Sequence, residues 1–120
     1  RRIMLGSFIL SAGYFDAYYK KAQAVKTAIF QEMESAFKEV DIIVTPTTPT
    51  VAWNIGDKFD DPIAMYLADI FTVTANIAGL PGISVPCGLA HKMPVGLQFI
   101  GPYLGDKKVL DAAFAFESAP

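Results

Sequence analysis

The sequence has one cysteine, Cys87, and one histidine, His91, among its 120 residues. A lone cysteine cannot form an internal disulfide, and no second cysteine lies at metal-ligand spacing, so a disulfide framework is excluded and a zinc site from these residues is not expected. No window of about 18 consecutive apolar residues occurs, and no charged-then-apolar leader is present. We therefore expect no membrane span and a cytoplasmic protein.

Clustered positive charge is also missing. The ten basic and twelve acidic side chains give a formal net charge of -2, and the basic residues are scattered along the chain. A protein that neutralises several phosphates needs a basic patch or stripe. We expect no direct nucleic-acid contact from this segment.

Apolar residues are abundant instead. Hydrophobic residues make up 52% of the chain and charged residues 18%, which is rich for a free-standing domain of this size. The chain opens on Arg1 and Arg2 without an initiator methionine. We expect residues 1–120 to be a single partial domain, part of whose apolar surface is covered by other protein.

The apolar pattern predicts helices at both ends of the chain and strands between them. Steps of three and four predict a long amphipathic helix over Ser11–Val40, lying on a sheet. The β-branched run Asp41–Thr45 is typical of a strand buried on both faces, as in parallel sheets. An ordered loop is expected over Val51–Asp61. Asp60 and Asp61 before Pro62 indicate a helix start.

The second half predicts a hairpin between two helices. Thr72–Ala78 is expected to be helical until Gly79. Ile83–Pro86 and Val95–Ile100 are expected strands, joined by a polar turn within Leu89–Pro94. A short helix over Asp106–Glu117 closes the chain. Together these elements predict an α/β fold.

Several small motifs are better explained by structure than by chemistry. Ser35 and Lys38 match an S-x-x-K pattern but lie on the amphipathic helix, without the motifs that accompany it in penicillin-binding enzymes. Cys87 lies four residues from His91, yet a small buried hydrophobe at a strand end is the better interpretation. Asp60 and Asp61 are interpreted as a helix cap rather than an acid/base pair or cation site.

Asp69 is the strongest candidate site residue, because it is an acid within the otherwise apolar run from Met65 to Phe71. Burying its carboxylate would cost several kcal/mol unless a cation or strong donors met it. An amino-acid ligand offers such a cation in its α-ammonium group, and its α-carboxylate would need an arginine. The alternative is a capping or salt-bridged structural acid.

Three segments resemble the C-terminal part of the amidase-signature family. They are MYLADIFTVTANIAGLPGISVPCGLAHKMPVGLQFIG (Met65–Gly101), RRIMLGSFILSAGYFDAYYKKAQ (Arg1–Gln23) and DIIVTPTTPT (Asp41–Thr50). The resemblance implies the α/β amidase-signature fold, a mixed sheet flanked by helices, incomplete in this chain. The family's catalytic residues, a Ser-cis-Ser-Lys triad with its Gly/Ser-rich loop, do not occur here.

Within this family the chain is similar to the branch that supplies ammonia to a tRNA-dependent amidotransferase. The resemblance implies a parent that hydrolyses glutamine, with Asp69 binding the ammonium of glutamine and Arg2, or by a one-residue shift Arg1, binding its carboxylate. It also implies B and C partner subunits, no cofactor in this segment, and ATP and Mg²⁺ used at a partner subunit. The chain alone is predicted to have no glutaminase activity.

Two alternatives remain open. The parent could be another amidase-signature hydrolase that acts on simple amides, because the strand and turn pattern is shared across the family. The chain could also be a non-catalytic interaction module whose apolar excess docks on another chain. A cut piece of a larger protein would instead be expected to associate through exposed sheet edges.

Overall fold

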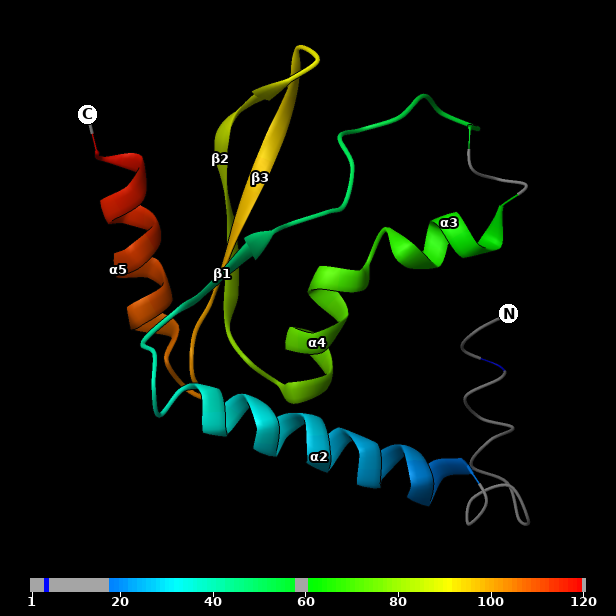
Figure 1. Cartoon of the computed structure of the whole chain (residues 1–120), viewed down its shortest axis with the longest axis vertical. Helices are drawn as coiled ribbons and strands as arrows, with labels where there is room; N and C mark the ends of the chain where they lie inside the picture. The colour runs from blue at the N-terminus through cyan, green and yellow to red at the C-terminus, as the bar shows by residue number, and fades with distance from the viewer. Residues whose placement is uncertain (1–3, 5–17, 58–60, 120) are drawn as a thin grey trace.

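In the computed structural model, residues 4, 18–57 and 61–119 are described. In chain order their elements are α2 (Lys20–Ala36), β1 (Ile43–Pro46), α3 (Pro62–Leu67), α4 (Ile70–Ala78), β2 (Gly82–Ala90), β3 (Met93–Ile100) and α5 (Asp106–Glu117). Helices flank a small sheet, as Figure 1 shows. The α/β class expected from the sequence is confirmed.

The three strands form one sheet in the order β1–β3–β2, and both strand pairs are antiparallel. The prediction of a doubly buried strand of the parallel type at Asp41–Thr45 is therefore wrong. Val44 is 50% exposed, and β1 pairs with a strand that runs the opposite way. A short β-branched run looks the same in either kind of sheet, so its pattern could not decide the direction of pairing.

A tight turn joins β2 to β3 and confirms the predicted hairpin. Both turn residues have positive φ, 53° at His91 and 64° at Lys92, which is the conformation of a two-residue type I′ turn. Such a turn matches the right-handed twist of the flanking strands. Both strands extend beyond the segments predicted from the sequence.

The two faces of the sheet have different coverings. On one face, Val85 and Phe99 pack against Val109 and Ala113 of α5, and this cluster forms the apolar core. The ring of Phe99 also lies 5.8 Å from that of Phe116. Helix α4 lies on the other side of the strands (Figure 1). Because neighbouring residues of a strand point to opposite faces, Phe99 faces α5 while Gln98 faces α4.

Helix α2 ends earlier than predicted and packs on a different element. It ends at Ala36 rather than Val40, and the predicted positions 11–17 lie outside the described residues. It packs on α4. The prediction that it lies on the sheet is therefore wrong. An amphipathic pattern shows that one face of a helix is covered but does not name the covering element.

The starts and ends of the shorter helices agree with the sequence. The Asp61 carboxylate accepts hydrogen bonds from the backbone N–H groups of Ile63 and Ala64, both at 3.0 Å, and Pro62 opens α3. Helix α4 begins two residues before the predicted Thr72 and ends at Gly79, whose φ of 69° places it in the left-handed region. Helix α5 has the predicted bounds.

Much apolar surface is uncovered. The radius of gyration is 17.4 Å, against about 14 Å for a compact domain of this length. Large apolar side chains such as Ile63, Tyr66 and Phe114 are more than half exposed. None of the described helices is long and apolar enough to cross a membrane.

Candidate functional site

A row of polar side chains crosses the sheet on the face toward α4. Gln98 of β3 is paired with Thr45 of β1 on one side and with Ser84 of β2 on the other. Directly paired residues of neighbouring strands project from the same face of a sheet. The three side chains therefore form one row, which we call the polar row, opposite the apolar face that packs on α5.

The polar row is hydrogen-bonded rather than left unsatisfied. Gln98 is only 6% exposed, and its Nε2 donates to Thr45 Oγ1 at 3.0 Å and to the backbone oxygen of Phe71 at 2.9 Å. Ser84 Oγ lies 2.5 Å from Thr47 Oγ1, with either hydroxyl able to donate. Because a buried amide is costly without partners, the two bonds of Gln98 fix the position of its side chain, while the Thr47–Ser84 pair is exposed.

A pocket of about 350 Å³ lies between the polar row and α4. Its polar lining comes from Thr47, Thr72, Asn76, Ser84 and Gln98. Among the described residues that line it none is ionisable, so the lining offers hydroxyl and amide groups only. Such a lining suits a neutral polar group better than a charged one, and the volume is that of a small-molecule site.

Asp69 lies at the start of α4, as its N-cap residue. It precedes Thr72 by three residues and Asn76 by seven, which is the spacing of one helix face, and both of those side chains line the pocket. Its side chain is exposed and makes no capping hydrogen bond. The carboxylate therefore avoids the cost of burial in the described structure, and of the structural alternatives, a capping or a salt-bridged acid, the capping hydrogen bond is not formed.

The other residues singled out from the sequence do not join this site. Arg1, Arg2 and Asp60 lie outside the described residues. Cys87 is exposed within β2, so the prediction of a buried small hydrophobe is wrong: the pairing of β2 continues past Cys87 to Ala90, and the residue is not at a strand end. His91 occupies the hairpin turn.

Gln98 is the residue that sequence reasoning missed. It is the one buried polar residue among the described side chains, set within the otherwise apolar end of β3. A polar side chain within an apolar strand run was a usable signal. Its partners were not visible, because Thr45 and Phe71 are distant in sequence.

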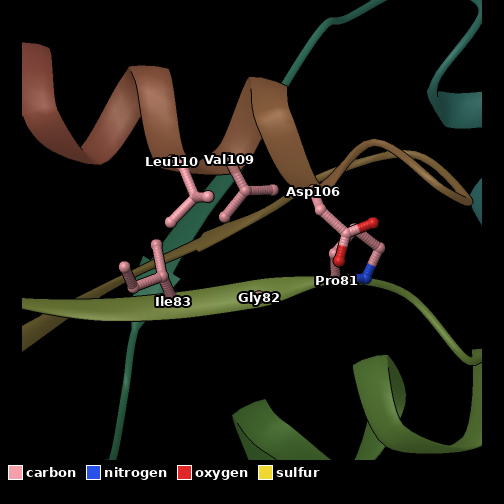
Figure 2. Close-up of a pocket in the computed structure, with 6 residues that line it drawn as sticks. All are labelled: Pro81, Gly82, Ile83, Asp106, Val109 and Leu110. Atoms are coloured by element: carbon pink, nitrogen blue, oxygen red, sulfur yellow. The ribbon is translucent and has the colours of Figure 1, made fainter.

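A second pocket, of about 250 Å³, lies on the opposite face of the sheet. Figure 2 shows Val109 and Leu110 of α5 facing Ile83 of β2, with Asp106 beside Pro81 at one end. This pocket is a gap in the apolar packing, and Asp106 is the single acidic residue that lines it. It brings together no converging polar groups, so the pocket under α4 is the better candidate site.

The ion pair between Asp41 and Lys108 near the sheet has a structural role. Lys108 Nζ lies 2.8 Å from Asp41 Oδ1, which joins α5 to the segment before β1. The hydrogen bond and the charge of Lys108 lower the pKa of Asp41 below its ordinary value. Within the described ranges, no three His, Cys, Asp or Glu residues gather closely enough to hold a metal ion.

The sequence and fold agree with one family of enzymes. The model of the amidase family, described as Amidase, matches residues 1–110, and the chain therefore belongs to this family. It is 60% identical over 119 residues to the A subunit of glutamyl-tRNA(Gln) amidotransferase of Thermoanaerobacter pseudethanolicus, an alignment that covers 99% of this chain and 24% of that protein. The chain spans about a quarter of the length of the curated relatives it matches.

Solved structures give the same result. The crystal structure of the A subunit of glutamyl-tRNA(Gln) amidotransferase from Thermotoga maritima is similar with a TM-score of 0.83 and 47% identity, over all of this chain and 26% of that one. A crystal structure described as an amidase has a TM-score of 0.81 and 26% identity, over 98% of this chain and 27% of that one. The fold is thus shared by several amidases, whereas the higher identity points to the amidotransferase.

Proposed function

We propose that this chain is the glutamine-binding side of a glutaminase subunit in a cytoplasmic glutamyl-tRNA(Gln) amidotransferase. The intact subunit hydrolyses the side-chain amide of glutamine and supplies ammonia for converting Glu-tRNA(Gln) to Gln-tRNA(Gln). The observation that carries the proposal is the 60% identity to a protein of that name over 99% of the chain. The uncovered apolar surface supports it, since further protein would cover that surface.

In this proposal Asp69 binds the α-ammonium of glutamine. Its carboxylate is exposed, at the end of α4 that precedes the pocket-lining Thr72. A carboxylate is favoured at the N-terminus of a helix by the helix dipole, and an exposed carboxylate can pair with a cation. Arg2, or Arg1, binds the carboxylate of glutamine. Two opposite charges held apart in this way orient the amide toward the nucleophile.

The remaining chemistry lies outside this chain. The rest of the protein supplies the Ser-cis-Ser-Lys triad that attacks the amide, so the chain by itself has no glutaminase activity. B and C subunits are the partners, and ATP with Mg²⁺ is used at one of these partners to activate the glutamyl group. The neutral lining of the pocket under α4 contributes binding, because hydroxyl and amide groups can hydrogen-bond to a polar ligand without a charge to balance.

The test compares two amides in the full-length protein. Glutaramate is glutamine without its α-amino group, so the ratio of kcat/KM for glutamine to that for glutaramate measures recognition of the ammonium. Asp69→Ala is expected to lower kcat/KM for glutamine on the order of a hundredfold while changing glutaramate much less, since it removes one partner of a charge pair.

Asp61→Ala is the matched control, because Asp61 is also an N-cap aspartate, of α3. It removes a helix cap, costs about 1 kcal/mol of stability and keeps the preference for glutamine. An unchanged ratio in Asp69→Ala would overturn the assignment of Asp69. Rapid hydrolysis of simple neutral amides without preference for glutamine would favour another amidase.

A further inference from the structure

Gln98 makes the hydrogen bond that ties the sheet to the first turn of α4. Its Nε2 lies 2.9 Å from the backbone oxygen of Phe71, the second residue of that helix, and 3.0 Å from Thr45 Oγ1. A backbone carbonyl can only accept, so the amide nitrogen of Gln98, and not its oxygen, must face Phe71. Both hydrogens of the amide nitrogen are thereby used, and three elements meet at one side chain.

The first turn of α4 is less buried than the second half of the helix. The buried residues of the helix, Ala75 and Ala78, both lie in its second half. In the first half Ile70 is 50% exposed and Val73 is 42% exposed. Apolar burial is therefore greatest in the second half of the helix, while the half-buried Phe71 and the bond from Gln98 hold the first half.

Asp69 belongs to the turn that this bond holds. Its backbone oxygen accepts hydrogen bonds from the N–H groups of Thr72 and Val73, both at 3.0 Å, and from Thr72 Oγ1 at 3.1 Å. Phe71 follows two residues after Asp69 within the same turn. A displacement of the Phe71 carbonyl must therefore move Asp69 as well.

We infer that Gln98 is a positioning residue for Asp69: by holding the Phe71 carbonyl it sets where the Asp69 carboxylate meets the ammonium group of the substrate. The inference rests on the proposed function, because it needs Asp69 to bind that ammonium. Gln98 acts through backbone geometry. Small displacements of a binding group can reduce the rate on the order of tenfold to a hundredfold.

The test uses the full-length protein with the same ratio of glutamine to glutaramate. Gln98→Met keeps the length of the side chain but donates no hydrogen bond to Phe71. It is expected to lower the ratio about tenfold, mainly by raising KM for glutamine. In an Asp69→Ala background the same substitution is expected to leave the ratio unchanged, because the group that Gln98 positions is already absent.

Each other outcome overturns the inference in a recognisable way. Equal losses on both amides would make Gln98 a structural residue, and a second tenfold loss in the Asp69→Ala background would mean that it acts independently of Asp69. Either result leaves the proposed function standing. An unchanged ratio in Asp69→Ala alone would remove the proposed role of Asp69 and this inference together.

If circular dichroism shows that Gln98→Met does not fold, a second variant replaces it. Gln98→Asn keeps the amide but is one methylene shorter, so it cannot reach Phe71 and Thr45 at their present distances. In this variant too, the ratio of kcat/KM for glutamine to that for glutaramate is expected to fall about tenfold. An unchanged ratio overturns the inference.

Discussion

Thr47 Oγ1 lies 2.5 Å from Ser84 Oγ, and Gly96 of the central strand lies beside the pair. A Cβ atom placed on Gly96 would lie 2.7 Å from each of the two oxygens, closer than real Cβ atoms approach. The missing side chain at position 96 therefore lets the two hydroxyl groups meet across β3, beside the pocket under α4.

Gly96→Ala is expected to separate Thr47 from Ser84 and to lower the free energy of unfolding by about 1–3 kcal/mol, the usual cost of overpacking. Chemical denaturation of the purified protein measures it. Gly82→Ala is the matched control in the neighbouring strand, since its nearest contact would be an ordinary 3.5 Å to the oxygen of Phe99. Equal losses in both variants would contradict the steric explanation.

The elements that the sequence predicted well are those with local signals. The Asp61–Pro62 start of α3, the Gly79 end of α4 and the bounds of α5 follow from caps and periodicity within a few residues. The hairpin follows from polar residues between two apolar runs. Each of these signals is carried by neighbours in the chain.

What the sequence could not predict depends on pairing between distant segments. The polar row exists because Thr45 and Ser84 are both in register with Gln98, and a shift of one residue would move each side chain to the other face. The antiparallel direction of β1 and the packing of α2 on α4 are likewise decided by tertiary contacts. The charge of Asp69 in an apolar run singled it out in the sequence, whereas only the structure shows that its side chain is exposed.

The hairpin turn offers a stabilising substitution. Lys92 has a φ of 64°, a conformation that costs a residue with a Cβ atom about 1 kcal/mol and costs glycine little. Lys92→Gly is therefore expected to raise the free energy of unfolding by up to about 1 kcal/mol, measured by thermal or chemical denaturation. Lys92→Ala is the control, because it removes the charge and keeps the Cβ atom; an equal gain there would show that the backbone is not the cause.

Gly101 and Val109 form a tightly packed pair where the chain leaves β3. A Cβ atom on Gly101 would overlap Val109 Cγ2, and Val109 is 2% exposed. We expect Gly101→Ala to destabilise the protein by about 1–3 kcal/mol. Val109→Ala is expected to cost roughly 2 kcal/mol through the cavity that it leaves.

The Gly101→Ala, Val109→Ala double variant should lose less than the two single losses combined. The added methyl group occupies space that the shortened side chain vacates, so a coupling of about 0.5–3 kcal/mol is expected. A double-mutant cycle from denaturation curves measures this coupling. Additive losses would mean that the two positions do not compete for the same space.

The ion pair between Asp41 and Lys108 predicts a pH dependence with a definite sign. Lys108 lowers the pKa of Asp41 in the folded protein, while the unfolded value stays near its ordinary value of about 3.9. The pair therefore stabilises the fold fully above that value, and its contribution disappears as the pH falls through the lower folded pKa. Asp41→Asn should be slightly less stable than the wild type at pH 7 and equal to it at the acid end of the range.

Denaturation curves of both proteins across this pH range, at low and high salt, measure the difference. Both side chains are largely exposed, at 87% for Asp41 and 56% for Lys108, so the deficit at pH 7 should be small and should shrink in high salt. Lys108→Met should show the same deficit at pH 7, and adding it to Asp41→Asn should cost no more. A deficit that is independent of pH and salt would mean that Asp41 stabilises the start of β1 by some contact other than its charge.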